Sequence, residues 1–512
     1  MNIGALLSNH ARRRPSHTAV VFEGSRLNFR EFHARVNGLA HVLSGLQVKK
    51  GDKVATILPN CLSLLEAYWA AAQTGAVVVP LSPLLREKAL AALLQDSDTG
   101  TIIASPEFAG PLAAIKPELR GVPEGRFLLT GSSRVAGFQS YEELTRDASE
   151  AEPPRTELAG DDPYNIIYSS GTTGTPKGIV HTHFIRAMYG TMFASTFRMT
   201  PESVVLHAGS IVFNGAFVTL MPAMYLGAKY VLQKSFDPRA FVETVERERV
   251  THVMMVPSQI VALVGSPHFS AEALQSLEML CTVGAPLHLE HKEKLNRCLP
   301  GRFYELYGLT EGFITVLDKN DYARKPTSVG PPQPFFEMRI VNEQGKDLAP
   351  GEIGEIVGRG PLLMPGYYKR PDLTAQAVVD GWLHTGDLGY ADEDGYLYLV
   401  DRKKDMIISG GTNVFPKDIE EIVVQHPAVR EAAVFGIPNE KWGETPVAAV
   451  ILNEPGAVTA EALREWINER VDAKNQRVQE VAILDDFPRS TAGKTLKRLL
   501  REPYWAGRDT KI

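Results

Sequence analysis

Apolar residues along the first third of the chain recur with helical spacing and with strand spacing in turn. Residues 29–43 carry apolar side chains three and four positions apart, which predicts an amphipathic helix. The segments that follow are expected to alternate as strand, helix, strand, helix and strand: residues 53–58, 62–73, 76–81, 87–94 and 101–104. Strands that alternate with helices favour a parallel sheet with crossover helices on its faces.

The same alternation returns in the middle of the chain, where we expect strands or helices at residues 204–213, 238–248, 252–256 and 277–283. From residue 328 to 398, short β-like pieces broken by Gly and Pro predict a small, distorted antiparallel barrel or sheet. A second unit follows, with helices and strands expected at residues 417–425, 429–435, 447–452, 460–470 and 478–484.

The predicted fold class is therefore α/β. A large N-terminal domain, residues 1–401, would contain parallel αβ sheets plus a distorted β-barrel. A small α+β domain would follow at residues 402–512, which is an ordinary domain size. A chain of 512 residues is too long for one compact core, which agrees with this division.

Charge and cysteine content narrow the class of protein. The formal net charge of -6 argues against a surface built for nucleic acid. The three cysteines are far apart and form no Cys-x-x-Cys pair, which excludes a disulfide framework and predicts a cytoplasmic location. Residues 208–228 carry no charge, but they contain a proline and three glycines. We therefore predict a buried strand and a helix there, not an integral membrane segment.

The run Ser169-Ser-Gly-Thr-Thr-Gly-Thr-Pro-Lys-Gly178 contains no apolar side chain except the proline ring. It follows residues 164–168, which read as a buried strand. Hydroxyls, glycine backbone N–H groups and the Lys177 ammonium are donors suited to phosphate. The run is not a Walker P-loop, because Lys177 stands between proline and glycine. By itself, such a run is more often a linker or turn.

Further segments carry residue types that suit the base, the ribose and the metal of a bound nucleotide. The turn Gly284-Ala285-Pro286 follows a predicted strand and would let a flat base lie against backbone. The segment Tyr307-Gly308-Leu309-Thr310-Glu311 offers a ring for stacking, a hydroxyl for phosphate and a carboxylate for Mg²⁺. Asp387, in a Thr-Gly-Asp turn, can accept ribose hydroxyls, and Arg402 is a matching donor. Each of these segments alone would as readily be structural.

In this order, the motifs resemble those of the adenylate-forming (ANL) superfamily, and in particular its AMP-forming acyl-CoA synthetases. The resemblance spans nearly the whole chain and ends at Pro488-Arg-Ser-Thr-Ala-Gly-Lys494. It implies catalytic roles for Lys494, Thr172 and Glu311, with Thr172 and Glu311 also holding the metal. It implies nucleotide contacts at Ser169, Ser170, Gly171, Thr173, Gly174, Lys177, Gly284, Ala285, Pro286, Glu305, Tyr307, Gly308, Thr310, Asp387 and Arg402.

The resemblance also implies the course of the reaction. A carboxylate attacks the α-phosphate of Mg-ATP, and the Lys494 ammonium offsets the charge that develops. The small domain then turns about a hinge at Lys404. Coenzyme A enters past a loop that contains Ser409, Gly410 and Gly411.

The acyl pocket is predicted at Phe213, Asn214, Gly215, Gly284 and Gly308. Many acyl-CoA synthetases carry a histidine where this chain places Phe213, so an apolar or aromatic acyl group is favoured. A core position for Phe213 is equally open. No aspartate stands there to pair with a substrate amine, which disfavours an amino-acid substrate. His181 and His183 are expected on one face of a strand, where a structural role is favoured over a metal pair.

The leading hypothesis is a ligase that joins a small-to-medium, branched or aromatic monocarboxylic acid to coenzyme A. The alternatives are an enzyme that loads a carrier protein's phosphopantetheine and a non-catalytic nucleotide sensor; Lys494 and Glu311 argue against the sensor. A monomer or homodimer is expected. The sequence does not identify the acid.

Overall fold

The computed structural model describes residues 2–131, 134–169, 176–410, 412–489 and 495–506. Its largest sheet, sheet A, has the order β15-β14-β13-β12-β10-β11-β1-β2. The strands from β14 to β1 run parallel, and β15 and β2 pair antiparallel at the two edges. The strands are β1 (Thr18–Phe22), β2 (Ser25–Asn28), β10 (Val204–His207), β11 (Lys229–Leu232), β12 (His252–Met255), β13 (Met279–Val283), β14 (Phe303–Gly308) and β15 (Ile314–Leu317).

Sheet B has the order β7-β6-β5-β3-β4-β8-β9. It is parallel except for β9, which pairs antiparallel with β8 as the last strand of the sheet. Its strands are β3 (Lys53–Ile57), β4 (Val77–Pro80), β5 (Thr99–Ala104), β6 (Phe127–Leu129), β7 (Gln139–Ser140), β8 (Pro163–Ser169) and β9 (Lys177–Thr182). The predicted alternation of strands and helices in the first third of the chain is thus confirmed as one parallel sheet.

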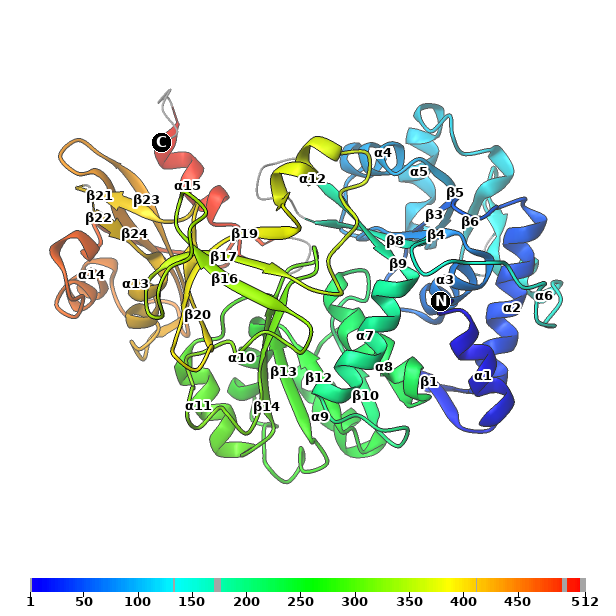
Figure 1. The fold of residues 1–512 in the computed structure, drawn as a ribbon, viewed down its shortest axis with the longest axis horizontal. Helices are drawn as coiled ribbons and strands as arrows, with labels where there is room; N and C mark the ends of the chain where they lie inside the picture. Colours follow the sequence, from blue (N-terminus) through cyan, green and yellow to red (C-terminus); the bar gives the residue numbers. More distant parts are fainter. Residues whose placement is uncertain (1, 132–133, 170–175, 411, 490–494, 507–512) are drawn as a thin grey trace.

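Helices cover both sheets and share one large core between them. Helices α7 (His183–Thr196) and α8 (Asn214–Leu226) lie between the sheets and pack against each other, as Figure 1 shows. The other helices of this part are α1 (Ala5–Arg13), α2 (Phe29–Gly45), α3 (Leu62–Thr74), α4 (Glu87–Asp96), α5 (Ala109–Ile115), α6 (Tyr141–Arg146), α9 (Pro238–Glu248), α10 (Pro257–Gly265) and α11 (Leu289–Cys298). Short 3₁₀ turns occur at η1 (Pro106–Phe108), η2 (Lys116–Glu118) and η3 (Glu124–Arg126).

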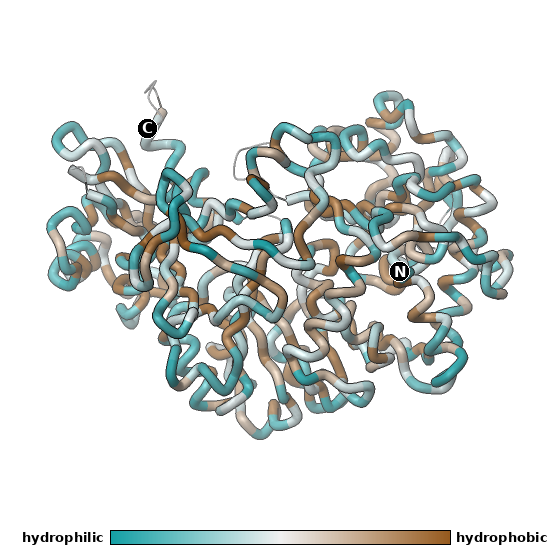
Figure 2. The backbone as a smooth tube through the Cα atoms, in the orientation of Figure 1, coloured by the Kyte–Doolittle hydropathy of each residue, from teal (hydrophilic) through white to brown (hydrophobic). Residues whose placement is uncertain are grey.

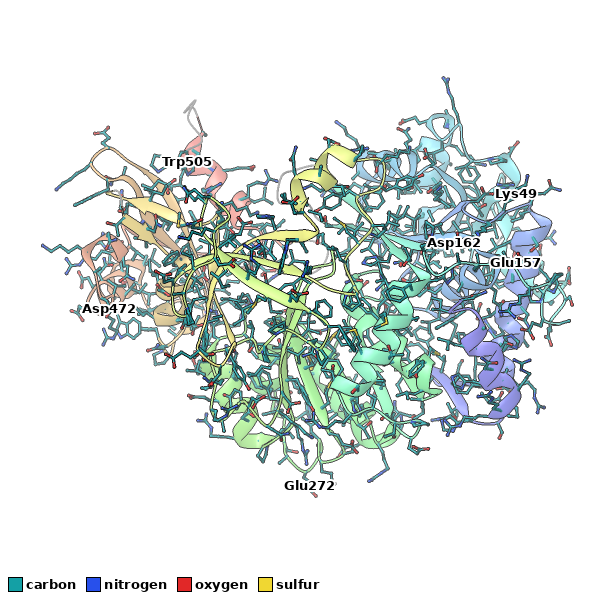
Figure 3. All side chains as sticks on the ribbon, viewed as in Figure 1. Lys49, Glu157, Asp162, Glu272, Asp472 and Trp505 are labelled. Atoms are coloured by element: carbon teal, nitrogen blue, oxygen red, sulfur yellow. The ribbon has the colours of Figure 1, made fainter. Side chains whose placement is uncertain are left out.

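Local chemistry explains where these elements begin. Helix α2 starts with a capping box, because Asn28 Oδ1 accepts from the Glu31 N–H at 2.9 Å and the Glu31 carboxylate accepts from the Asn28 N–H at 2.9 Å. Figure 2 shows hydrophobic stretches running through the interior and hydrophilic stretches in many of the outer loops. The labelled charged residues Lys49, Glu272 and Asp472 lie at the periphery in Figure 3. The separation of apolar from charged positions is the expected result of removing apolar surface from water.

An antiparallel sheet, sheet C, follows sheets A and B in the chain, and a small α+β unit follows sheet C (Figure 1). Of the barrel and the sheet expected after residue 328, the sheet is observed. Its elements are β16 (Glu337–Val341), β17 (Gly354–Arg359), α12 (Pro371–Ala377), β18 (Val378–Val379), β19 (Trp382–Ala391) and β20 (Leu397–Arg402). The α+β unit comprises β21 (Ile407–Ser409), β22 (Thr412–Val414), α13 (Pro416–Val423), β23 (Val429–Asn439), β24 (Gly443–Leu452), α14 (Ala460–Asn468), η4 (Lys474–Gln476), β25 (Glu480–Ile483) and α15 (Lys497–Trp505).

The element expected at residues 204–213 is longer than the strand that the structure has there. Strand β10 ends at His207, because side chains take over the backbone hydrogen bonds beyond it. Asn60 accepts from the Ile211 N–H at 2.9 Å and donates to the Gly209 carbonyl at 2.6 Å, and Tyr68 Oη donates to the Ile211 carbonyl at 2.8 Å. The uncharged segment that follows forms the buried helix α8. Among the helices that the structure describes, none is long and apolar enough to cross a bilayer.

The strand expected to carry both histidines is also too long. Strand β9 ends at Thr182, whose hydroxyl accepts from the Ile185 N–H and starts helix α7 at His183. His181 Nε2 donates to the Thr310 carbonyl at 2.9 Å, and His183 Nδ1 accepts from the Ile3 N–H at 3.4 Å. Burial lowers the pKa of His183 to about 4. Each ring thus has one hydrogen-bond partner in the fold, which favours the predicted structural role. Among the described residues, no group of three or more His, Cys, Asp or Glu side chains could hold a metal ion.

Candidate active site

The predicted phosphate loop connects the last two strands of sheet B. Ser169 ends β8, Lys177 begins β9, and the two residues are register partners. A short connection between antiparallel partners keeps both of its ends at one edge of the sheet. Ser170, Gly171, Thr172, Thr173 and Gly174 lie outside the described residues, so their phosphate contacts stay a prediction.

Lys177 and Glu311 meet across one aromatic ring. The Lys177 ammonium lies 4.9 Å from the centroid of the Tyr367 ring, and Tyr367 Oη donates to Glu311 Oε1 at 2.9 Å. Burial, together with the Glu311 charge, raises the pKa of Tyr367, so the phenol stays protonated and donates. The Lys177 ammonium can attract the phosphates of a triphosphate bound next to the end of strand β8, and the Glu311 carboxylate can bind the metal that accompanies them.

Sequence reasoning missed Tyr367. The Tyr367 ring is held in place from two sides, because Tyr367 forms a β-bridge with Ile179 and its N–H donates to Thr374 Oγ1 at 2.9 Å. The segment Pro365-Gly366-Tyr367-Tyr368 predicts only a turn, because it contains a Pro and a Gly in succession. Nothing in that composition shows that the turn folds back onto strand β9, where Ile179 lies 188 positions earlier than Tyr367.

The donor set around Glu311 suits a hard cation. A carboxylate offers about four lone-pair sites, so the hydrogen bond from Tyr367 leaves acceptor capacity. Mg²⁺ takes oxygen ligands and is commonly shared with substrate phosphates. Glu311 therefore fits the metal role that the sequence predicts, whereas Thr172 lies outside the described residues.

The predicted ribose site is assembled at the edge of sheet C. Asp387 and Arg402 are register partners on β19 and β20, and Arg402 Nε lies 3.4 Å from Asp387 Oδ1. Tyr307 Oη donates to Asp387 Oδ2 at 2.8 Å. The Thr385 hydroxyl accepts from the Asp387 N–H at 3.1 Å, which fixes the turn. The structure therefore brings together three residues that lie up to 95 positions apart in the sequence.

The glycine turns lie at the carboxyl ends of two neighbouring parallel strands. Gly284, Ala285 and Pro286 follow β13, and Gly308 ends β14, whose Leu306 is the register partner of Val283. Gly284 has φ +94°, a conformation that side chains rarely adopt. A Cβ at Gly308 would lie 2.7 Å from the Phe313 carbonyl oxygen, so only glycine fits. In open α/β sheets, ligands bind outside the carboxyl ends of the strands.

Glu305 lies two residues before Tyr307 on strand β14 and is almost fully buried. Its carboxylate forms an ion pair with Lys292 Nζ at 2.5 Å. Burial raises the pKa of Glu305 against the opposing attraction of Lys292. This pairing gives Glu305 a structural role, and the nucleotide contact predicted for it stays a prediction.

Replacing Lys292 with Met is expected to destabilise the protein by about 3–5 kcal/mol at pH 8, because it leaves a buried carboxylate without a partner. The folded-state pKa of Glu305 already lies above its unfolded value and rises further without Lys292. Stability from such a group is present at low pH and is lost as the pH rises through the folded pKa. The destabilisation should therefore shrink at pH 5, as measured by urea denaturation. The double variant Lys292→Met, Glu305→Gln is the control and should recover most of the loss; an equal loss at both pH values would contradict the argument.

The predicted hinge lies where sheet C passes into the α+β unit. Asp401 Oδ1 accepts from the Arg402 N–H at 2.7 Å, and its Oδ2 accepts from the Lys417 N–H at 3.1 Å. Burial raises the pKa of Asp401 to about 6, and desolvation lowers the pKa of Lys404 to about 8. A further link joins helices α11 and α13, where His288 Nδ1 lies 3.0 Å from a Glu421 carboxylate oxygen.

The proposed coenzyme A loop is a turn between two short strands. Ser409 ends β21 and is buried, and Gly410 has φ +61°. A Cβ at Gly410 would lie 2.6 Å from the Trp442 ring, and the Gly410 N–H donates to the Trp442 carbonyl at 2.7 Å. Gly411 and Lys494 lie outside the described residues, so the structure does not test their roles.

The fold combines two parallel αβ sheets, an antiparallel sheet and a small α+β unit, and it brings together side chains that the sequence predicts for a nucleotide and its metal. A family model described as "AMP-binding enzyme" matches residues 7–368, and one described as "AMP-binding enzyme C-terminal domain" matches residues 418–494. The chain therefore belongs to the AMP-binding enzyme family. Its full-length relatives place it among the acyl-CoA synthetases of the adenylate-forming superfamily, in the reaction class of the acid–thiol ligases.

Relatives over the full length agree with this membership. A feruloyl-CoA synthase of Amycolatopsis sp. is 35% identical, with 98% of this chain and 99% of the relative covered. A long-chain-fatty-acid–CoA ligase of Mycobacterium tuberculosis is 33% identical, with 99% of each covered. The crystal structure of ATP-bound MatB from Rhodopseudomonas palustris has a TM-score of 0.89 at 29% identity, with 99% of each chain covered.

Proposed function

We propose that the chain activates a small-to-medium monocarboxylic acid, within a range that includes branched and aromatic acids, and transfers its acyl group to coenzyme A. The observation that carries this proposal is the Lys177–Tyr367–Glu311 arrangement, which shares no residue with the Tyr307–Asp387–Arg402 cluster. The Lys177–Tyr367–Glu311 arrangement suits the leaving pyrophosphate with Mg²⁺, and the Tyr307–Asp387–Arg402 cluster suits the ribose. The names of the relatives, which span aromatic and fatty acids, support the acid class without selecting one.

In the first step, a carboxylate oxygen of the acid attacks the α-phosphorus of ATP. The bond from that phosphorus to the bridging oxygen breaks, and pyrophosphate leaves with its electron pair. Lys177 attracts the departing phosphates, and Lys494 offsets the charge between carboxylate and α-phosphate. Glu311 and Thr172 would hold Mg²⁺, which when bound neutralises charge on the phosphates.

In the second step, the sulfur of the coenzyme A thiol attacks the acyl carbonyl carbon. The bond from this carbon to the AMP oxygen breaks, AMP leaves and the thiol proton passes to solvent. The site has to position the two reactants and exclude water, since the acyl-adenylate is already activated. The hinge at Lys404 and the loop of Ser409, Gly410 and Gly411 belong to this step.

The test separates coenzyme A from a carrier protein as the acceptor. The purified enzyme is incubated with ATP, Mg²⁺ and a panel of linear, branched, hydroxylated and aromatic acids, and pyrophosphate release identifies which acids are activated. Each activated acid is then offered free coenzyme A or a holo-carrier protein, and thioester is measured by mass spectrometry. We expect thioester with free coenzyme A. Thioester with the carrier protein alone would overturn this choice of acceptor, and no pyrophosphate with any acid would overturn the proposal itself.

A further inference from the structure

Arg186 of helix α7 is a charged side chain in the middle of the core. It is fully buried, and its guanidinium lies 4.0 Å from the Phe217 ring centroid and 4.8 Å from that of Tyr189. Its Nε donates to Asn165 Oδ1 at 3.0 Å, and its Nη1 donates to Asn214 Oδ1 at 2.9 Å. Within the described ranges, Arg186 forms no ion pair and its Nη2 has no hydrogen-bond partner.

An arrangement of this kind is costly. A buried charge without an opposite charge loses its hydration and regains little of it from neutral amides. Burial accordingly lowers the pKa of Arg186, against the attraction of the surrounding tyrosines. An apolar residue of similar volume would pack here without that cost. The guanidinium must therefore do something that packing alone does not require.

Its clearest effect is to fix the Asn214 amide. Arg186 holds the Asn214 oxygen, and on the other side Asn214 Nδ2 donates to Tyr189 Oη at 2.9 Å. The amide cannot turn over without placing an N–H against the guanidinium. Each amide has two N–H donors and two lone pairs, so Asn214 keeps one donor with a fixed direction.

Asn214 lies at the wall proposed for the acyl pocket and is partly exposed, unlike Arg186 behind it. The next residue, Gly215, faces the end of strand β13: a Cβ there would lie 3.6 Å from Met254 Cε and 3.9 Å from Val283 Cγ1. Val283 directly precedes Gly284 of the glycine turn. Asn214 thus stands beside the place where the acyl-adenylate is proposed to bind.

We propose that Asn214 donates its second amide N–H to an oxygen atom on the acyl group, remote from the reacting carboxylate, and that Arg186 is the positioning residue that fixes this donor. The preferred acid then carries a hydroxyl, ether or carbonyl oxygen and is not a plain hydrocarbon acid. This inference rests on the proposed function and narrows its substrate class. It adds an oxygen atom to the apolar or aromatic acyl group that Phe213 alone favours.

The test uses pairs of acids that differ by one oxygen. Suitable pairs are 3-phenylpropanoic with 3-(4-hydroxyphenyl)propanoic acid, and hexanoic with 6-hydroxyhexanoic acid. The ratio of kcat/KM for the oxygenated acid to that for its partner is measured by pyrophosphate release. For at least one pair we expect a ratio of about 10 in the wild type, the value of one good hydrogen bond. Asn214→Leu should reduce it to about 1 with the KM for ATP unchanged.

Two further variants separate positioning from packing. Arg186→Met should reduce the ratio as Asn214→Leu does, and Arg186→Lys should restore part of it, whereas a merely structural role would change both acids of a pair alike. Tyr225→Phe is the matched control, because it alters an exposed position of the same helix as Asn214, outside the proposed pocket, and should leave the ratio unchanged.

The outcomes are distinct. A ratio near 1 for every pair in the wild type, or a ratio that Asn214→Leu leaves unchanged, overturns the inference while acid activation itself stands. Asn214→Leu decides the matter even where Arg186 variants do not fold. If no acid of either pair or of the wider panel releases pyrophosphate, it is the proposed function that fails.

Discussion

Lys494→Ala should lower the rate of acyl-adenylate formation by about 10²–10³-fold, the loss typical of removing one group that offsets transition-state charge. Thioester formation from supplied acyl-adenylate and coenzyme A should stay near the wild-type rate, because no α-phosphate is attacked in that step. The two half-reactions are measured separately, the first by acid-dependent ATP–pyrophosphate exchange and the second by thioester yield in the absence of ATP.

The control for this variant is Lys474→Ala, which removes an exposed lysine of the same unit and should affect neither half-reaction. Equal losses in both half-reactions for Lys494→Ala would mean that the residue supports the unit's structure and not the first step. Unchanged exchange would remove Lys494 from the reaction altogether.

Glu311→Gln should reduce kcat/KM for ATP by roughly 10²-fold and raise the Mg²⁺ concentration needed for half-maximal rate, because a neutral amide is a poor ligand for a hard cation. The substitution keeps the shape of the side chain and an oxygen that can accept from Tyr367 Oη, now at 2.9 Å from Glu311. The measurement is a Mg²⁺ titration of pyrophosphate release at fixed ATP.

Tyr367→Phe is expected to lower kcat/KM for ATP less than Glu311→Gln does. It deletes the hydrogen bond to Glu311 but keeps the ring beside Lys177, so a loss of about 3–10-fold is expected. A Mg²⁺ titration of Glu311→Gln that coincides with the wild type would show that the carboxylate does not serve the metal.

Much of the fold follows from the periodicity of the sequence. The helix expected at residues 29–43 is α2, Phe29–Gly45, and the element expected at residues 238–248 is helix α9 with the same bounds. Periodicity fails where side chains replace ladder hydrogen bonds, as Asn60 does after His207. It also fails at His183, because a capping threonine converts a strand to a helix within one residue.

The candidate site was only partly predictable for a related reason. Asp387 and Arg402 fall in motifs whose composition indicates their chemistry, and the strand register then pairs them. Tyr367 and Arg186 act through partners far away in the sequence, Glu311 in one case and Asn214 in the other. Local composition does not predict contacts of this kind, because they depend on how helices and strands distant in the sequence pack against one another.

The clusters proposed for nucleotide binding draw on all three sheets of the large part of the chain. Lys177 comes from sheet B, Tyr307 from sheet A, and Asp387 from sheet C. No contiguous fragment that lacks one of these sheets contains a complete set. A nucleotide that contacts residues of all three sheets would link the sheets to one another. Its binding free energy would then favour the state in which all three are folded. Nucleotide binding would therefore stabilise this whole part of the chain against unfolding, and not one sheet alone.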